Sequence, residues 1–189
     1  MDTSVNHKNI YYPPGGILMW IIIFLELITF GIALISMMYM SKSDPIVFHE
    51  SRLLLDPVYG FINTVVLLTS GLFMASSVYE FKQSNKVKFK KHVGFAIFFG
   101  IVFLVVKFIE YNSKIDAGLI LGYNTFFNFY WLLTLFHVIH VVVGLVILTT
   151  LILSSENKIE LADVEAGASF WHMCDLIWLL LFPVIYLIF

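Results

Sequence analysis

The stretch from Phe170 to Phe189, FWHMCDLIWLLLFPVIYLIF, restricts the possible folds of this chain more than any other segment. It is long and apolar enough to cross a membrane, yet it carries His172 and Asp175 about one helical turn apart. Ionisable side chains at such a depth are costly, and they usually face protein and a partner. Every other long apolar segment also carries polar or ionisable residues. We therefore expect a helical bundle whose interior satisfies buried polar groups.

The composition indicates a membrane protein. Of the 189 residues, 60% are hydrophobic and 13% are charged, which excludes an ordinary soluble domain. Spans of ~20 residues each allow about five transmembrane helices with short loops. The net charge of -2 does not indicate a nucleic-acid partner. The only cysteine, Cys174, lies in an apolar segment, so the chain has no internal disulfide framework.

We predict an all-α fold with a single domain over residues 1–189, a polytopic membrane protein built as a bundle of five transmembrane helices. The first apolar run is too long for a typical signal peptide, so we predict an uncleaved helix. Asp56 and Pro57 are typical of an N-cap and a first helical position. Pro183 should bend the last helix because it removes one backbone hydrogen bond. The expected helices cover about residues 17–40, 57–79, 93–111, 125–153 and 165–189.

A cluster of lysines predicts the orientation in the membrane. It lies between the second and third helices and consists of Lys82, Lys86, Lys88, Lys90 and Lys91. Cytoplasmic loops carry an excess of lysine and arginine, which places this loop in the cytoplasm. With five spans, the N-terminus is then cytoplasmic and the C-terminus periplasmic.

Each predicted helix carries one stripe of small and polar residues at alternating three- and four-residue steps, the spacing that keeps side chains on one face. Small residues let membrane helices approach closely, and polar residues bond across the interface. We therefore expect the stripes to face one another or a partner protein. In chain order, the stripes are Glu26, Thr29, Ala33 and Ser36; Gly60, Asn63, Leu67, Ser70, Met74 and Ser77; Ala96, Gly100, Phe103, Lys107 and Glu110; Leu133, His137, His140 and Gly144; and His172 with Asp175, flanked by Trp171 and Trp178.

The depth of each residue along its helix, at ~1.5 Å per residue, predicts which ionisable groups meet. We expect a buried polar layer in the inner half of the membrane. Within it, Glu26 should pair with a histidine of the fourth helix, with His140 as the first choice, which leaves His137 to approach the last helix or the partner. Lys107 and Glu110 lie three residues apart near the outer end and are predicted to form an ion pair. The predicted layer consists of Glu26, His137, His140, His172 and Asp175.

Two chemical interpretations of these residues stay open. His137 and His140 on one helical face are compatible with a metal site, and histidines on facing helices with haem ligation. The simpler interpretation is a set of mutually satisfied buried polar groups, because no second HxxH and no CxxC supports a metal site. Glu26 is likewise compatible with a step in a proton path, or with a hydrogen bond to a histidine alone. We predict no catalytic, metal-binding or cofactor-binding residue.

Five sequence blocks, in order from Trp20 to Tyr186, carry a family resemblance. They are FLELITFG with Glu26, LDP followed by INTVVLLTSG, FIEY, FHVIHVVVG with its two histidines, and EAGASFWHMCDLIWL with His172 and Asp175. Together they resemble subunit III of the haem-copper oxidases, the cytochrome c oxidase subunit 3-like family. Within that family, VKFIEYNSKIDAG and DLIWLLLFPVIYL resemble the accessory subunit found with nitric oxide reductases (NorE-type).

The resemblance implies a non-catalytic subunit without a redox cofactor of its own. Its partner would be a large subunit I-like catalytic subunit that holds haem and copper or iron, and its role to stabilise that subunit and support proton uptake in respiratory electron transport. It implies a multi-pass protein of the bacterial cytoplasmic (inner) membrane with bound membrane lipids, but no nucleic acid and no soluble substrate. Two alternatives remain: an independent haem- or metal-binding membrane protein that uses the histidine layer, and a small proton carrier. Whether the parent complex reduces dioxygen or nitric oxide stays open.

Overall fold

The computed structural model describes residue 13, residues 15–154 and residues 159–189, so the predicted cytoplasmic N-terminus lies outside the described residues. All regular structure in the described part is helical. The elements are α1 (Ile17–Ser43), α2 (Pro45–Leu53), α3 (Pro57–Lys82), α4 (Lys86–Asp116), α5 (Thr125–Leu153), α6 (Leu161–Pro183) and the π-helical segment η1 (Val184–Ile188). Among the described residues, five helices are long and apolar enough to cross a membrane: α1, α3, α4, α5, and α6 continued by η1. The predicted all-α class with five membrane spans is confirmed.

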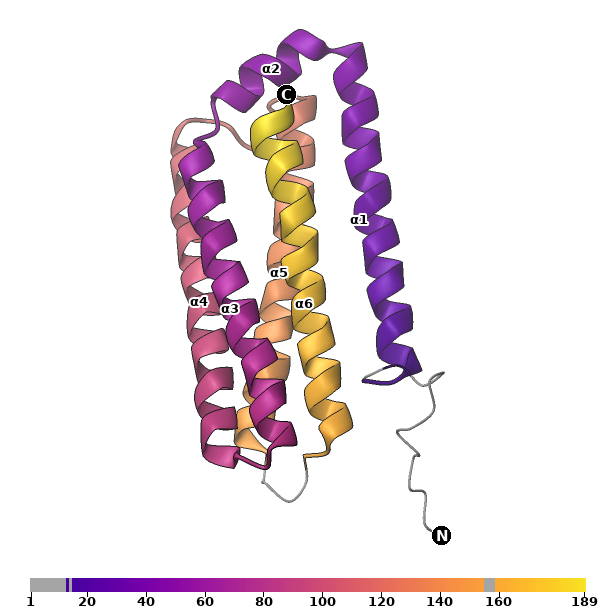
Figure 1. Ribbon diagram of the computed structural model, residues 1–189. Coiled ribbons are helices and arrows are strands. Elements are labelled where there is room, and N and C mark those ends of the chain that lie inside the picture. The colour runs from indigo at the N-terminus through magenta and orange to yellow at the C-terminus, as the bar shows by residue number, and fades with distance from the viewer. Residues whose placement is uncertain (1–12, 14, 155–158) are drawn as a thin grey trace.

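Helices α3, α4, α5 and α6 run side by side as a bundle, and α1 lies along one side of it (Figure 1). The most extensive interface joins α3 and α4, which are consecutive and linked by a short turn. Helix α6 packs against α3, α5 and α1. α1 begins at one end of the bundle and the chain ends at the other, near α2 (Figure 1). The last helix is therefore the common neighbour of three others, so its inward-facing polar residues can contact side chains of several helices.

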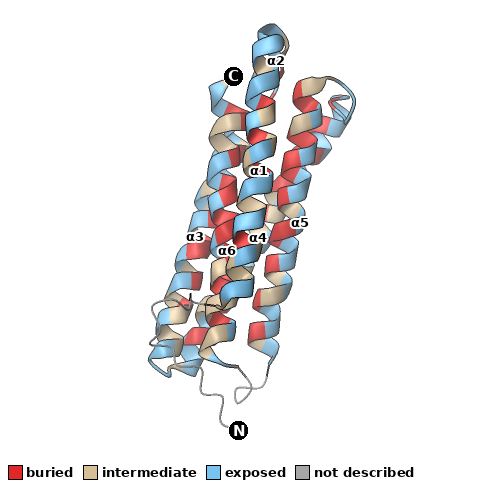
Figure 2. Cartoon of the chain, turned by 90° about the vertical axis from the view of Figure 1, so that its right-hand side faces the viewer, coloured by how far each residue is buried: buried red, intermediate tan, exposed pale blue. Residues whose placement is uncertain are grey.

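Burial follows the inward faces of the spans (Figure 2). α6 has the densest set of buried residues, whereas only Ile23, Phe30, Leu34 and Met37 are buried on α1. The outward faces carry large apolar side chains, among them Ile32 on α1 and Phe108 on α4. Apolar surface on every span is what lipid or an apolar partner requires.

Helix starts follow local capping chemistry and extend beyond the apolar segments. Asp56 caps α3 as predicted, because its Oδ1 accepts a hydrogen bond from the Val58 amide at 2.9 Å. α4 begins at Lys86 and not near residue 93, because the side chain of Asn85 caps it and the lysine-rich run stays helical. α6 begins at Leu161 and not near residue 165, because Glu160 and Asp163 form a capping box. The predicted bounds of residues 125–153 agree with α5, whereas hydropathy underestimated the lengths of α1, α3 and α4 and placed the start of α6 too late.

Helix α2 was not predicted. Its nine residues are too few to cross a membrane, and they run across one end of the bundle between α1 and α3 (Figure 1). Pro45 occupies its first turn and Phe48 is buried beneath it. Arg52 donates a hydrogen bond from Nε to the carbonyl of Tyr186 at 3.0 Å, which ties α2 to the end of the last span.

The backbone changes character at Pro183. The α-helix ends there and the next five residues, η1, are π-helical. Proline lacks the N–H that would bond to the carbonyl four residues earlier, so the regular ladder is interrupted at this point. Tyr186 lies in this π-helical segment and is buried in the bundle interior.

Candidate functional site

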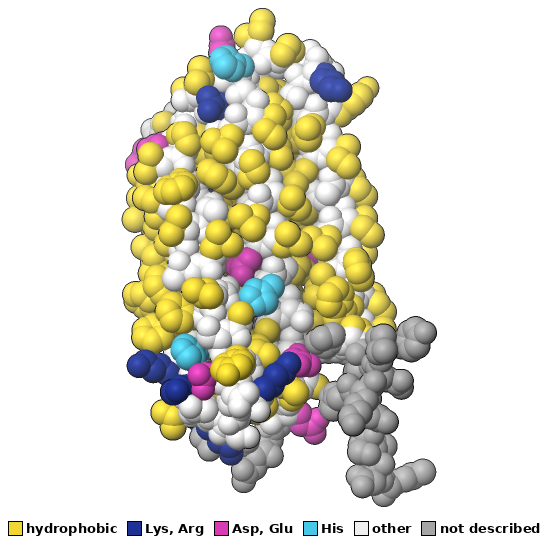
Figure 3. Space-filling view, in the orientation of Figure 1, with side chains coloured by type: hydrophobic (Ala, Val, Ile, Leu, Met, Phe, Trp, Pro, Cys, Tyr) yellow, Lys and Arg dark blue, Asp and Glu magenta, His cyan; other side chains and the backbone are white. Residues whose placement is uncertain are grey.

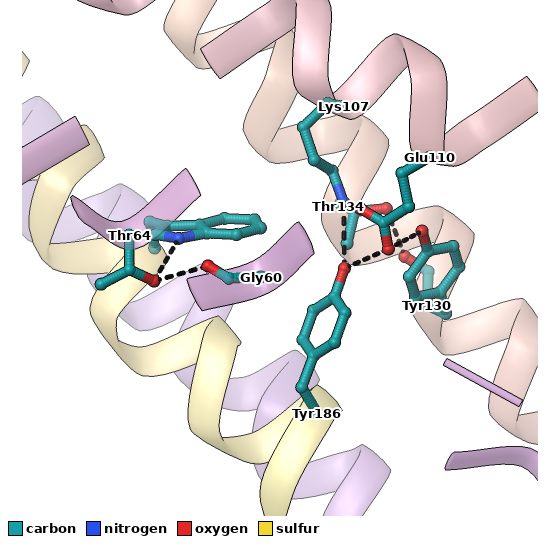
Figure 4. A network of polar contacts seen from close by, with 8 residues as sticks. Gly60, Thr64, Lys107, Glu110, Tyr130, Thr134 and Tyr186 are labelled. Atoms are coloured by element: carbon teal, nitrogen blue, oxygen red, sulfur yellow. Dashed lines mark hydrogen bonds and ion pairs between the residues drawn. The ribbon is translucent and has the colours of Figure 1, made fainter. Parts of the chain in front are cut away.

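The most completely buried polar group of the bundle is a cluster that we call the lysine–tyrosine cluster. It consists of Lys107 and Glu110 from α4, Tyr130 from α5 and Tyr186 from η1 (Figure 4). Lys107 Nζ donates to Glu110 Oε2 at 2.9 Å, and the two side chains are 1% and 0% exposed. The structure thus places Lys107 and Glu110 together, three residues apart on one helix, deep inside the protein.

Two tyrosines complete the lysine–tyrosine cluster. Tyr130 and Tyr186 donate their hydroxyls to Glu110 Oε1 at 3.0 and 2.6 Å, and Lys107 Nζ also reaches the Tyr186 hydroxyl at 3.2 Å. The ammonium group lies 5.2 Å from the ring centre of Trp178, whose face attracts cations. Both carboxylate oxygens and the ammonium are therefore satisfied within this chain. A buried ion pair is tolerated only when further hydrogen bonds complete it in this way.

Glu26 of α1 and His140 of α5 form a second contact. Glu26 Oε2 lies 3.2 Å from His140 Nε2. The distance suits an ion pair, but the atoms are not aligned as a hydrogen bond, and Glu26 Oε2 has no hydrogen-bond partner in the described part of the chain. The edges of the histidine ring meet Phe30 and Phe136. The structure thus brings together the two residues that the depth argument pairs.

The other nitrogen of His140 determines where protons lie in this pair. His140 Nδ1 is 2.7 Å from the Phe136 carbonyl, which only accepts, so Nδ1 carries a hydrogen. Nε2 then carries either a lone pair or a second proton. Glu26 contacts it favourably as a neutral acid beside neutral imidazole, or as a carboxylate beside imidazolium. In both cases the two groups together carry one proton, either on the Glu26 carboxyl or on His140 Nε2.

His137 lies between aromatic rings and is fully buried. Its imidazole stacks on Trp178 of α6, with ring centres 5.4 Å apart, and meets Phe103 edge-on. His137 therefore approaches the last helix, which is one of the two neighbours predicted for it. Neither ring nitrogen has a hydrogen-bond partner among the residues that the structure describes.

The α3 stripe faces the bundle interior as expected, and Gly60, Asn63, Ser70 and Ser77 are all buried. Ser70 Oγ donates to the Ala96 carbonyl of α4 at 2.7 Å and accepts from Trp171 Nε1 of α6 at 3.1 Å, so one hydroxyl joins three helices. A Cβ added at Gly60 would lie 2.7 Å from the Phe182 ring, which shows why a small residue is needed there. Close packing and cross-helix hydrogen bonds thus coincide on this face.

The α1 stripe, unlike that of α3, does not face the other helices of this chain along its whole length. Thr29 is exposed, and its hydroxyl donates to the Leu25 carbonyl of its own helix at 2.9 Å. Ser36 does the same with Ile32 at 2.8 Å. Hydroxyls that bond one turn back are satisfied without a neighbouring helix, so small polar residues on α1 do not mark its buried face.

His172 and Asp175 form a third pair, which we call the dyad. His172 Nδ1 lies 3.2 Å from Asp175 Oδ2. Asp175 is buried, but 44% of the His172 side chain is exposed, so its assignment to a buried layer is wrong. At this position α6 turns the histidine outward, toward the surface between α3 and α1. Among the described residues, no hydrogen bond or ion pair joins the dyad to Glu26 or His140.

The histidines do not assemble into a larger ligand set in the described part of the chain. There, no group of three or more His, Cys, Asp or Glu side chains lies close enough to hold a metal ion. His137 and His140 are adjacent in sequence spacing but turn to different partners, an aromatic ring of α6 and a carboxyl of α1.

Sequence reasoning missed the two tyrosines around Lys107, and it named Trp178 only as a flank of the His172–Asp175 stripe, without its contact with Lys107. Tyr130, Tyr186 and Trp178 have apolar bodies with a polar tip, so hydropathy treats them as lipid-facing or core residues alike. The sequence feature that indicates the cluster is a lysine, Lys107, within an apolar span. Such a residue requires a carboxylate and further hydrogen-bonding groups at its own depth.

Five apolar spans whose interior carries satisfied polar clusters define an integral, multi-pass α-helical membrane protein. Residues 18–188 match the family described as cytochrome c oxidase subunit III. The chain belongs to this family of haem-copper oxidase subunits.

Individual relatives agree with this assignment. The chain is 27% identical over 181 residues to the heme-copper oxidase subunit I+III of Aeropyrum pernix, a match that covers 90% of this chain and 22% of that protein. It is 28% identical over 132 residues to cytochrome c oxidase subunit 3 of Synechocystis, covering 67% and 55% of the two chains. Against cytochrome c oxidase subunit 3 of Corynebacterium diphtheriae it is 24% identical over 205 residues and covers all of both. The chain thus spans about a fifth and about half of the first two relatives.

Proposed function

We propose that this chain is a non-catalytic, subunit III-like component of a respiratory haem-copper oxidase or nitric oxide reductase complex. In this proposal it packs in the membrane beside a large subunit I-like catalytic subunit, which holds the haem and the copper or iron. It steadies that subunit and supports its proton uptake. The lysine-rich end of the bundle, at the turn between α3 and α4, lies in the cytoplasm, and the complex resides in a bacterial cytoplasmic membrane with bound lipids.

One observation carries the proposal. The Aeropyrum pernix relative is described as subunit I+III, which places both subunits in one polypeptide, and its match covers 90% of this chain. Fused partners in one species support contact between separate partners in another. The interior of this chain is also consistent with an accessory role, because Lys107, Glu110 and Glu26 all contact side chains of the chain itself.

Purification through an affinity tag on this chain, in mild detergent from its native membrane, tests the proposal. We expect a large subunit to be recovered, with haem bands in the visible spectrum that belong to that subunit. Oxygen and nitric oxide uptake by the same complex then decides between the two parent reactions. Recovery of the chain alone, with its own haem band or with proton flux in liposomes, would support the haem-binding or carrier alternative instead.

The orientation is tested separately. A reporter that is active only in the periplasm should be active when fused after Phe189 and inactive when inserted at Lys88. A cytoplasmic signal from the C-terminal fusion would reject the proposed orientation.

A further inference from the structure

We propose that the groove between α3 and α6, with the dyad at its centre, is the docking surface for a membrane-spanning helix of the catalytic subunit. That helix carries a side-chain hydrogen-bond donor at the depth of Asp175. The inference rests on the proposed function, because it assigns the contact to that partner.

The groove is an open depression of about 370 Å³ in the middle of the bundle surface. Its walls are apolar: Leu68 and Leu72 on α3, and Leu176 and Leu179 on α6. Leu72, Leu176 and Leu179 are 67%, 45% and 39% exposed, so a neighbouring molecule has free access to them. Walls of this kind suit the apolar side chains of another helix.

Gly71 of α3 forms the floor of the groove. A Cβ at this position would collide with Asp175 Oδ2. The carboxylate therefore lies directly against the backbone of α3, and it does so only because residue 71 has no side chain. The close approach holds a charged group in a defined place at the bottom of an apolar groove.

The free atoms of the dyad are hydrogen-bond acceptors. With the carboxylate ionised, His172 Nδ1 carries the hydrogen that points to Asp175 Oδ2, which leaves Nε2 as an acceptor. Asp175 Oδ1 is buried and has no partner among the described residues. The acceptor of the dyad that an outside molecule can reach is therefore His172 Nε2, on a side chain that is 44% exposed, and a donor on a docking helix would satisfy it.

The depth of the dyad excludes the ordinary sources of a donor. Asp175 lies roughly 20 Å along α6 at ~1.5 Å per residue, near the middle of a span of 28 residues. Figure 3 shows acidic and histidine side chains near the middle of this face, surrounded by apolar ones. The hydrocarbon core offers neither water nor headgroups, and acyl chains have no donor. A protein helix with a hydroxyl, amide, indole or cationic side chain supplies one at this depth.

The opposite face of the bundle has no such requirement. Its depression, between α4 and α5, is lined by Ile101, Val105 and Val142 and by Lys107, which is already satisfied by Glu110 and Tyr186. Lipid chains suffice to cover it. A third depression, between α1 and α6, is lined by His172 but not by Asp175, so among these three the whole dyad lines only the α3–α6 groove.

Site-specific photo-crosslinking in the whole complex tests the inference. A photoreactive amino acid replaces Leu72 or Leu179 in the groove, or Phe108 or Val142 on the opposite face as exposure-matched controls. We expect adducts with the large subunit from the two groove positions and not from the controls.

Substitution of the dyad gives an independent readout. Asp175→Leu removes the oxygen that accepts from His172 Nδ1 and so orients the exposed Nε2, whereas Asp175→Asn keeps an acceptor oxygen at that position. We expect the leucine variant to retain at least roughly threefold less large subunit through detergent purification, and the asparagine variant to retain most of it, in line with interhelical hydrogen bonds in membranes. Equal loss in both variants would show that the acceptor does not matter, and would overturn this part of the inference.

The outcomes separate the two proposals. If the large subunit is recovered but adducts form only at Phe108 or Val142, or only lipid adducts form at Leu72 and Leu179, the docking surface is wrong and the proposed function stands. If no large subunit is recovered with the unsubstituted chain, the proposed function itself fails.

Discussion

The lysine–tyrosine cluster and the dyad share the same sequence spacing of a basic residue and a carboxylate, but they differ in burial and in their hydrogen-bond partners. Each is a basic side chain and a carboxylate three residues apart on one membrane-spanning helix, Lys107 with Glu110 and His172 with Asp175. In the cluster, two tyrosines from other helices complete the carboxylate, and the pair is sealed from its surroundings. In the dyad, one carboxylate oxygen stays without a donor and the histidine is half-exposed.

The difference shows that spacing alone does not assign a role to an intramembrane ion pair. A pair that its own chain satisfies stabilises the bundle, whereas a pair that its own chain leaves open requires a partner. The Glu26–His140 contact lies between these cases, because it joins two helices of the chain but is imperfectly aligned. Substitutions in these three pairs should therefore destabilise the isolated chain to different extents.

Glu110→Leu should destabilise the isolated chain most. It leaves the Lys107 ammonium buried without a counter-charge, which costs about 3–5 kcal/mol in buried pairs. The midpoint of unfolding in mixed detergent micelles measures the effect. Asp116→Asn is the control on the same helix, because Asp116 is exposed and should change the midpoint little. A midpoint for Glu110→Leu equal to that of the control would contradict the structural role of the cluster.

Glu26→Leu should have the next largest effect. It removes the carboxyl that lies 3.2 Å from His140 Nε2 and leaves that nitrogen without a polar neighbour, at about 1–3 kcal/mol. Glu26→Gln should be close to the unsubstituted chain, because its amide N–H can donate to the same nitrogen. The unfolding midpoints of both variants measure the effect. The haem spectrum of the purified complex should stay unchanged in both. If the glutamine variant is as unstable as the leucine variant, the stability of the chain depends on the charge of the Glu26 carboxylate, and an uncharged amide does not replace it.

Tyr186→Phe should destabilise the chain by about 0.6–2 kcal/mol, the range for single interhelical hydrogen bonds in membranes. The Tyr186 hydroxyl contacts both Glu110 and Lys107, whereas that of Tyr130 contacts only Glu110, so Tyr130→Phe should cost less. The same unfolding assay compares the two. The reverse order would mean that the Lys107 contact adds nothing.

His172→Leu should have the smallest effect on the isolated chain, within about 0.5 kcal/mol, as for exposed ion pairs generally. Its effect should instead appear as weaker retention of the large subunit, because the histidine lies in the proposed docking groove. A large drop in the unfolding midpoint without any loss of the partner would show that the dyad stabilises the chain itself, as the lysine–tyrosine cluster does, and does not bind a partner.

The stripes of α3, α4 and α5 were predictable because small and polar residues recur there at helical spacing. Gly60, Ser70, Gly100 and Gly144 all face neighbouring helices, and Trp171 packs against the last two. On α1 the same pattern does not mark a face buried within this chain, since Thr29 and Ser36 bond to carbonyls of their own helix. A hydroxyl is therefore weaker support for a buried face than a glycine that a neighbouring side chain needs.

By itself the sequence determined the class, the number of membrane spans and the pairing depth of Glu26 and His140, because length, hydropathy and rise per residue are properties of single helices. The rotation of each helix about its axis is different, since it depends on how all the helices pack together. Only the tertiary structure turned Tyr130 and Tyr186 toward Lys107, and turned His172 outward while Asp175 came to lie on Gly71. Those rotations separate the pair that the chain completes from the pair that it leaves open.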